Sequence, residues 1–239
     1  MKNEKCNILI TGASRGIGAA SLELLRKRGA NVMGHCSRNN DDLISADLSK
    51  DGSAIELWSR SLDLFNGRID VLINNAGVFE PNPLDSDSGD WLSSWNRTMQ
   101  INLTASAELC RLAVLHWQQS GCGGRIINIA SRAAHRGDSP AHWHYAASKG
   151  GMVAMTKTIA RAYAAEQIYA FAICPGFTMT GMAEDYLTSR GGDKLLADIP
   201  LGRVATSEEI SAAVGFCALD APPSMTGAVL DINGASYVR

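Results

Sequence analysis

Short apolar runs alternate with longer helix-like segments along the whole chain, and this alternation limits the possible folds more than any other feature. The apolar runs span residues 6–11, 31–35, 43–46, 69–73, 125–130, 169–173 and 228–232. The helix-like segments span 16–28, 51–65, about 91–119, 145–166 and 206–218. Unbroken apolar strands that alternate with helices indicate a parallel sheet covered on both faces. We therefore predict a doubly wound α/β fold.

The chain has 239 residues, of which 46% are hydrophobic, and no repeat or linker divides it. This length suffices for one large core, so we expect a single domain over residues 1–239. Only the segment CSRNNDDL separates the second apolar run from the third. A crossover helix needs a longer connection, so we expect no helix between these two strands.

Composition argues against several classes of partner. The formal net charge of −2 gives no reason to expect nucleic acid or an anionic membrane as a partner. The first apolar run is too short for a signal peptide, and no stretch approaches the roughly 20 apolar residues of a membrane span. The six cysteines are scattered without a CxxC pair, which suits neither a zinc site nor a disulfide framework. We expect a cytoplasmic protein with reduced thiols and no metal.

A glycine-rich turn follows the first apolar run. Gly12, Gly16 and Gly18 stand between that run and an amphipathic helix. Glycine at such a turn lets the backbone approach a pyrophosphate, and the N-terminus of the following helix attracts phosphate. The pattern predicts dinucleotide binding, and a tight strand-to-helix turn without a ligand is the alternative.

The end of the second apolar run bears on which dinucleotide binds. An acid there would hold a ribose 2′-hydroxyl, but the chain has Cys36 and Ser37 followed by Arg38, and Arg15 lies in the glycine turn. Two guanidinium groups favour the extra phosphate, so NADP(H) is favoured over NAD(H). In the alternative, a carboxylate at Asp41 or Asp42 folds back onto the ribose.

Tyr145 and Lys149 lie one helical turn apart in the segment HYAASKGG, with only small residues between them. A phenol has a pKa near 10, and lowering it by about three units requires roughly 4 kcal/mol. One positive charge at 5–6 Å supplies on the order of 3 kcal/mol at an effective dielectric constant of 20. We expect Lys149 to lower the pKa of Tyr145 for proton transfer. A surface pair without a role is the alternative.

Seven motifs together resemble the short-chain dehydrogenase/reductase family over essentially the whole chain. They are TGASRGIG (11–18), Asp47 after the third strand, NNAG (74–77), Asn102 in INLTA, Ser131 in NIAS, YAASK (145–149) and PGFTMT (175–180). The C-terminal segment from GRVATSEE onward resembles the β-ketoacyl carrier-protein reductase branch. The resemblance implies a seven-stranded Rossmann sheet, NAD(P)-dependent hydride transfer, a substrate lid at about 178–200 and commonly a homotetramer.

The resemblance also implies roles for individual residues. Tyr145 would be the general acid/base, Lys149 would hold the nicotinamide ribose, and Ser131 would bind the substrate oxygen. Asn102 would bend its helix and position a water in the proton relay. Cofactor contacts fall on Gly12, Ser14, Arg15, Gly16, Ile17, Gly18, Arg38, Asp47, Leu48, Asn75, Ala76, Gly77, Tyr145, Lys149, Pro175, Gly176, Thr178 and Thr180.

Residues 132–144 contain three of the five histidines, together with Arg132, Arg136 and Trp143. The loop could form a polar or anionic substrate pocket, but a solvated loop with a packed tryptophan is the favoured interpretation, since loops are usually solvated.

The leading hypothesis is an NADP(H)-dependent enzyme that acts on a small carbonyl or alcohol. One alternative is a β-ketoacyl carrier-protein reductase. Such enzymes present basic residues to their acidic carrier, but Cys122 and Glu166 occupy the corresponding positions here. A non-catalytic NADP-binding sensor or scaffold is the alternative of another class.

Overall fold

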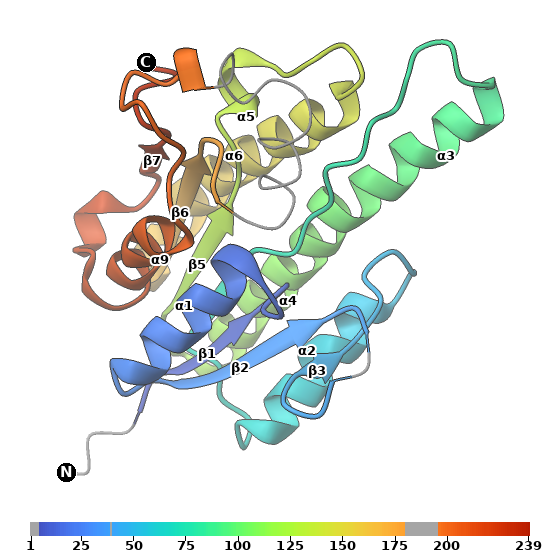
Figure 1. Cartoon of the computed structure of the whole chain (residues 1–239). Coiled ribbons are helices and arrows are strands. Elements are labelled where there is room, and N and C mark those ends of the chain that lie inside the picture. Colours follow the sequence, from blue (N-terminus) through green and yellow to red (C-terminus); the bar gives the residue numbers. More distant parts are fainter. Residues whose placement is uncertain (1–4, 39, 180–195) are drawn as a thin grey trace.

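The computed structural model describes residues 5–38, 40–179 and 196–239, and its centre is one parallel sheet (Figure 1). Seven strands lie in the order β3-β2-β1-β4-β5-β6-β7. All of the paired strands run parallel. In chain order they are β1 Asn7–Ile10, β2 Asn31–Cys36, β3 Ile44–Ser45, β4 Val71–Asn74, β5 Gly124–Ile129, β6 Ile168–Pro175 and β7 Val229–Ile232. The predicted doubly wound sheet is confirmed.

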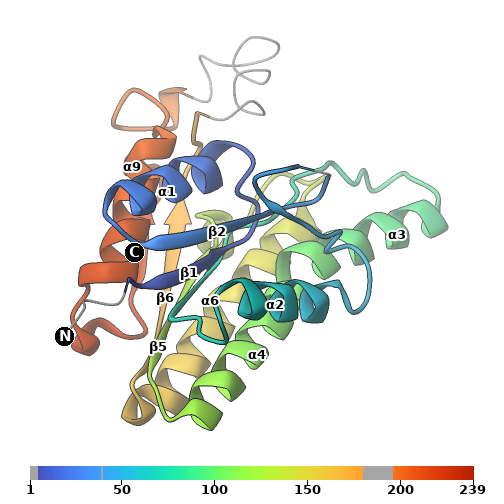
Figure 2. The ribbon, with the colours of Figure 1, turned by 90° about the horizontal axis from the view of Figure 1, so that it is seen from below.

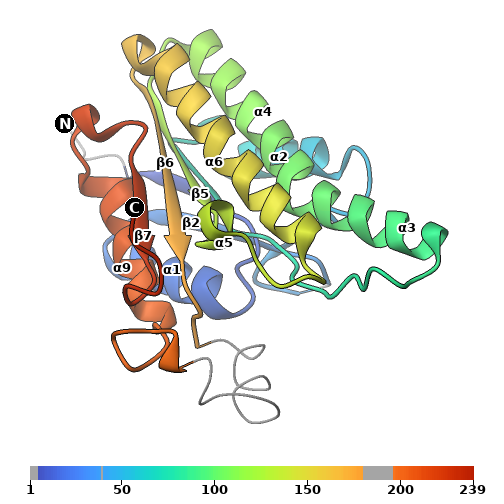
Figure 3. The same cartoon turned by 90° about the horizontal axis from the view of Figure 1, so that it is seen from above.

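Helices cover both faces of the sheet (Figures 2 and 3). One face carries α1 (Gly16–Lys27) and α9 (Ser207–Gly215), which pack against each other. The opposite face carries α2 (Ser53–Leu64), α4 (Ala105–Ser120) and α6 (Trp143–Tyr163). The remaining helical segments are α3 Ser88–Met99, η1 Gln100–Thr104, α5 Ala133–Arg136, η2 Ala164–Glu166, η3 Phe216–Asp220 and η4 Pro223–Met225. Within the described ranges, no helix is long and apolar enough to cross a membrane.

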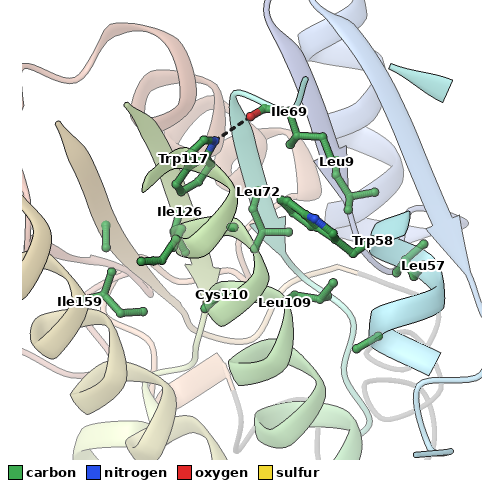
Figure 4. Packing of buried hydrophobic residues seen from close by; sticks show 14 of the residues in the cluster. Leu9, Leu57, Trp58, Ile69, Leu72, Leu109, Cys110, Trp117, Ile126 and Ile159 are labelled. Carbon is green, nitrogen blue, oxygen red and sulfur yellow. Dashed lines mark hydrogen bonds between the residues drawn. The ribbon is translucent and has the colours of Figure 1, made fainter. Parts of the chain in front are cut away.

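The core lies in two layers, one on each side of the sheet. On the side of α2 and α4, Leu9, Leu72 and Ile126 from the strands meet Trp58 and Trp117 from the helices (Figure 4). The indole nitrogen of Trp117 donates a hydrogen bond of 2.7 Å to the carbonyl of Ile69. This bond satisfies the buried N–H, so the large ring can remain fully inside the core.

Local sequence explains the start of α9. The hydroxyl of Thr206 accepts from the backbone N–H of Glu209 at 3.2 Å, and the Glu209 carboxylate accepts from the backbone N–H of Thr206 at 2.8 Å. This reciprocal capping box satisfies two N–H groups that have no partner within the helix.

The structure differs from the sequence prediction in two places. The segment between β2 and β3 has no helix among its described residues, as predicted, but β3 is only two residues long. The helix predicted at 91–119 is divided into α3 and α4 by the π-helical turn η1. A π-helical turn holds one extra residue in the helix and is frequent at functional sites.

The strand ends determine where a site can form. The carboxyl ends of β1, β4, β5 and β6 lead directly into Thr11, Asn75, Ala130 and Gly176. Because the strands are parallel, these ends meet at one edge of the sheet, where open α/β sheets bind their ligands.

Candidate active site

The glycine turn packs tightly against the end of β4. Gly12 has a φ of +67°, and a Cβ placed there would lie 2.8 Å from the Cα of Ala76. A Cβ on Gly18 would overlap the carbonyl oxygen of Gly12. The side-chain amide of Asn75 closes the turn by donating to the carbonyls of Thr11 at 3.0 Å and Gly12 at 2.9 Å. These contacts explain why glycine is required at positions 12 and 18.

The N-terminus of α1 fits the pyrophosphate of a dinucleotide. Arg15 occupies the N-cap position without a side-chain capping hydrogen bond, and the first turn has no acidic residue. Ser14 and Arg15 are exposed, while Gly16 and Ile17 are partly exposed. Unpaired N–H groups and the positive end of the helix dipole are the features that bind phosphate at such a turn.

Two residues that support this turn escaped the sequence prediction. The hydroxyl of Thr11 accepts from the backbone N–H groups of Asn75 and Ala76, each at 3.0 Å. The buried imidazole of His35 accepts from the N–H of Gly12 at 3.2 Å through Nδ1, and its Nε2 lies 2.8 Å from the carbonyl oxygen of Ala46. Because Ala46 offers only an acceptor, Nε2 carries the proton and the imidazole is neutral. The sequence signal for both residues was a polar side chain at the end of an otherwise apolar run, Thr11 after β1 and His35 in β2.

Arg15, at the N-cap of α1, and Arg38, two residues after β2, are both exposed. The thiol of Cys36 donates to the carbonyl of Arg38 at 2.9 Å and occupies the position where an acid would hold a ribose. Asp41 and Asp42 are exposed in the connection to β3. Within the described ranges, neither guanidinium forms an ion pair, so both remain available to a ligand.

Asp47 and Leu48 follow β3, as the motif requires. The carboxylate of Asp47 accepts from the hydroxyl of Ser49 at 2.7 Å and from its N–H at 3.1 Å, and these bonds lower the pKa of Asp47. Leu48 is buried. The ordered carboxylate and the apolar side chain therefore lie together at the start of the connection to α2.

Asn102 lies in η1 and is fully buried. Its side-chain oxygen accepts from the N–H of Val78 at 2.8 Å, and its amide donates to the carbonyl of Val78 at 3.0 Å. The same amide lies 3.3 Å from the hydroxyl of Ser148 on α6. The asparagine thus connects the bent helix to the segment that follows β4 and to the helix that carries Tyr145.

Tyr145, Lys149, Ser131 and Gly77 converge at the sheet edge. The Nζ of Lys149 lies 5.8 Å from the centre of the Tyr145 ring and donates to the carbonyl of Ile129 at 2.8 Å. A Cβ placed on Gly77 would lie 3.3 Å from the side-chain oxygen of Asn102 and 3.6 Å from this Nζ, so glycine lets the backbone run close to both side chains. The hydroxyl of Ser131, at the end of β5, interacts with the phenol.

The expectation that Lys149 lowers the pKa of Tyr145 is wrong for this structure. Burial raises the pKa of Tyr145 to about 12, and the hydrogen bond with Ser131 only partly opposes this rise. Burial also lowers the pKa of Lys149 to about 8. Desolvation penalises both charged forms, and the lowering that opposes it at Tyr145 comes from Ser131 rather than from Lys149. The phenol therefore keeps its proton at neutral pH.

The segment after β6 lies at the same edge of the sheet as the glycine turn and Tyr145, and this edge between them is called the groove below. Pro175 ends the strand, and the N–H of Gly176 donates to the carbonyl of Ile232 at 2.9 Å. A Cβ on Gly176 would lie 2.8 Å from the Cα of Asn233. Thr178 is buried, and its hydroxyl donates to the carbonyl of Gly176 at 3.2 Å. Thr180 and residues 181–195 of the predicted lid lie outside the described residues.

Comparison with known proteins supports this arrangement. The family model described as enoyl-(acyl carrier protein) reductase matches residues 12–235. The chain belongs to the short-chain dehydrogenase/reductase family. The 3-oxoacyl-[acyl-carrier-protein] reductase FabG of Salmonella typhimurium is 34% identical over 96% of each chain. The FabG of Haemophilus influenzae is 35% identical, covering 96% of this chain and 97% of that protein.

A third relative has a different printed activity. The cis-4-hydroxycyclohexanecarboxylate dehydrogenase of Sinomonas cyclohexanicum is 33% identical, covering 95% of this chain and 94% of that protein. The chain is therefore an NAD(P)-dependent oxidoreductase that acts on a C=O or CH–OH group. The printed names of its relatives refer both to a 3-oxoacyl-[acyl-carrier-protein] substrate and to a cyclic hydroxycarboxylate.

The structure corrects one part of the favoured interpretation of residues 132–144: residues 138–140 are solvated, as expected, but the tryptophan is not packed. Arg132 is buried, with its guanidinium 4.7 Å from the centre of the Phe177 ring, while Trp143 is 54% exposed rather than packed. Arg136 forms an ion pair of 2.7 Å with Asp198. The loop is thus anchored by its arginines to the chain on either side of residues 180–195.

Three further side chains gather at the ends of β6 and β7 and in α5, in a way that the sequence spacing did not suggest. His135, Cys174 and Asp231 place one possible metal-ligating atom each within 4.8 Å of one another. Asp231, however, accepts a hydrogen bond of 2.8 Å from Arg239, and burial raises the pKa of the Cys174 thiol to about 11. A metal needs the thiolate, so both features disfavour ligation.

Proposed function

We propose that this oxidoreductase reduces a small free carbonyl compound with NADPH, or oxidises the corresponding alcohol with NADP⁺. The convergence of Tyr145, Ser131, Lys149 and Asn102 at the open edge of the sheet is the observation that carries the proposal. A non-catalytic sensor or scaffold does not need this set of groups beside a dinucleotide site.

The protonation state of Tyr145 suits reduction. The nicotinamide supplies the hydride when it is bound, and the carbonyl oxygen then needs a proton. The phenol holds that proton, because burial raises its pKa to about 12. Ser131 lies beside the phenol, where its hydroxyl can donate a hydrogen bond to the same substrate oxygen. Lys149 would hold the nicotinamide ribose, and Asn102 would order a water in the path that returns the proton.

The preference for NADP(H) rests on charge. Arg15 and Arg38 are exposed, and no carboxylate follows the last residue of β2 directly. A guanidinium binds a phosphate through charge-assisted hydrogen bonds, whereas a ribose 2′-hydroxyl is usually held by an acid.

The preference for a free substrate rests on the surface that a carrier protein would approach. Cys122 is exposed, and Glu166 is exposed and accepts a hydrogen bond of 2.8 Å from Gln118. A carboxylate that faces an acidic carrier repels it, and such like-charge contacts cost several kcal/mol. FabG proteins are 3-oxoacyl-[acyl-carrier-protein] reductases by their printed names, so carrier-linked reduction remains the second candidate function.

One assay tests the proposal. Ketones, sugars and acyl thioesters are offered with NADPH and with NADH, and an acetoacetyl group is offered both on carrier protein and on a small thioester. We expect turnover of a free ketone with NADPH. A strong preference for the carrier-bound group, abolished by added salt, would show the free-substrate proposal wrong. No turnover with any carbonyl and either cofactor would favour the sensor.

We further propose a cytoplasmic homotetramer without nucleic acid or membrane as a partner. All six cysteines are free thiols, which suits a reducing compartment. On α6, Ala147, Ala154 and Ala162 are exposed and permit close helix approach, whereas Ala105 and Ala113 on α4 are buried in the core and cannot contribute. Light scattering at micromolar concentration tests the assembly, and a monomer would contradict it.

A further inference from the structure

A pair of stacked rings lies directly beside the proposed proton donor. Phe79 and His142 stack with their ring centres 4.0 Å apart and their planes at 9°. Phe79 also meets Tyr145 edge-on, with the ring centres 4.7 Å apart and the planes at 80°. All three residues are partly exposed, so the two rings lie beside the phenol at the protein surface.

The two rings come from the two segments that frame the groove. Phe79 follows Gly77 by two residues, so the segment that contacts the cofactor also carries this ring. His142 precedes Tyr145 by three residues at the N-cap of α6. The N–H of Asn82 donates to the carbonyl of Ala141 at 2.8 Å and ties the two segments together.

Contacts behind the rings hold them in place. The Nδ1 of His142 lies 2.6 Å from the hydroxyl of Ser139, which fixes the orientation of the imidazole. His144 is buried, with its ring centre 6.3 Å from that of His142 and 6.4 Å from that of Trp95. The stacked pair is therefore a pre-organised aromatic wall beside the phenol rather than an adaptable one.

A rigid wall discriminates between substrate shapes. A ring substrate packs against it with little loss of conformational freedom, whereas a flexible chain must be immobilised along it at an entropic cost. The geometry points to Phe79 and His142 as specificity-determining residues that select a cyclic ketone or alcohol over a linear one. This inference rests on the proposed function and narrows its substrate class.

The test compares two ketones with the same number of carbon atoms, cyclohexanone and 2-hexanone, by kcat/KM with NADPH. We expect the unmodified protein to favour cyclohexanone. In Phe79→Leu, which keeps an apolar side chain but removes the rigid ring, the ratio should fall by about 2- to 13-fold, the range for immobilising one flexible group. His142→Gln should lower the ratio in the same direction, while Phe216→Leu and His116→Gln, both outside the groove, should leave it unchanged.

Each outcome decides a separate question. NADPH binding by the variants shows that they are folded. A preference for 2-hexanone in the unmodified protein, or an unchanged ratio in both folded groove variants, would overturn the inference while leaving the proposed function intact. Absence of turnover with every ketone and thioester would overturn the proposed function and the inference with it.

Discussion

At the scale of single residues, Tyr145 decides whether the groove is an active site. Tyr145→Phe removes the transferable proton but keeps the ring against Phe79. We expect turnover to fall by about 10²–10⁴-fold, the usual contribution of a general acid, while NADPH still binds. Steady-state kinetics and a fluorescence titration of NADPH measure the two effects. Full turnover by the variant would remove Tyr145 from the mechanism.

The two arginines give a second prediction at this scale. A charge-assisted contact contributes about 1.5–3 kcal/mol, so Arg38→Ala or Arg15→Ala should raise the dissociation constant of NADP⁺ by roughly 10- to 150-fold. Binding of NAD⁺ should change little, because it lacks the 2′-phosphate. Arg60→Ala, an exposed arginine of α2 paired with Glu56, is a matched control. Equal affinity of the unmodified protein for the two cofactors would contradict the preference.

At the scale of elements, η1 connects helices α3 and α4 to the segment after β4 through the hydrogen bonds of Asn102 with Val78. Asn102→Ala removes both bonds to the backbone of Val78, and leaving a buried polar group unpaired costs about 1–3 kcal/mol. We expect the free energy of unfolding to fall by that amount or more, as measured by urea denaturation. Asn96→Ala on the exposed face of α3 makes the same substitution and should have little effect. Equal stability of the two variants would show that the Val78 bonds do not hold the segment.

Apolar periodicity predicted the strands, the helices and the missing crossover between β2 and β3, because burial repeats along each element. It could not predict η1, since the extra residue of a π-helical turn is stabilised by Asn102 contacting a segment 24 residues away. The motifs also gave the positions of Tyr145 and Lys149. The predicted direction of the Tyr145 pKa shift was wrong, because desolvation depends on neighbours from other strands and loops. The spacing of Tyr145 and Lys149 in the sequence does not contain that information.

At the scale of the whole molecule, histidine burial links stability to pH. All five histidines, at positions 35, 116, 135, 142 and 144, have a lowered pKa, and burial is the first cause in each case. The folded protein therefore takes up protons only at a lower pH than the unfolded chain, whose histidines titrate near 6.5. Since the unfolded state binds more protons below that pH, stability is highest above it and falls as the pH decreases.

The carboxylates with shifted pKa values do not contribute to the change in stability between pH 7.5 and 5.5. Asp47, Asp198, Glu209 and Asp220 have lowered pKa values because of their hydrogen-bond partners, so their stabilisation is present above the unfolded values of 3.8 and 4.5 and is lost only at lower pH. Lys149, with a pKa of about 8, adds a contribution of the same sign only near pH 7.5, so most of the change in stability down to pH 5.5 comes from the histidines. Urea denaturation across this range, at fixed protein concentration, should show a midpoint concentration that falls steadily as the pH is lowered from 7.5 to 5.5.

One variant tests how much of this pH dependence of stability comes from the histidine beside the glycine turn. His35 is the histidine that supports Gly12, and it is neutral because its Nδ1 must accept the Gly12 N–H. His35→Gln should lower stability at pH 7.5, since it cannot reproduce both hydrogen bonds, and it should also make the midpoint depend less on pH. His116→Gln, on α4 and remote from the turn, should leave cofactor affinity unchanged, whereas His35→Gln should weaken it. A midpoint that is constant or rises towards pH 5.5 in the unmodified protein would contradict the burial of neutral histidines.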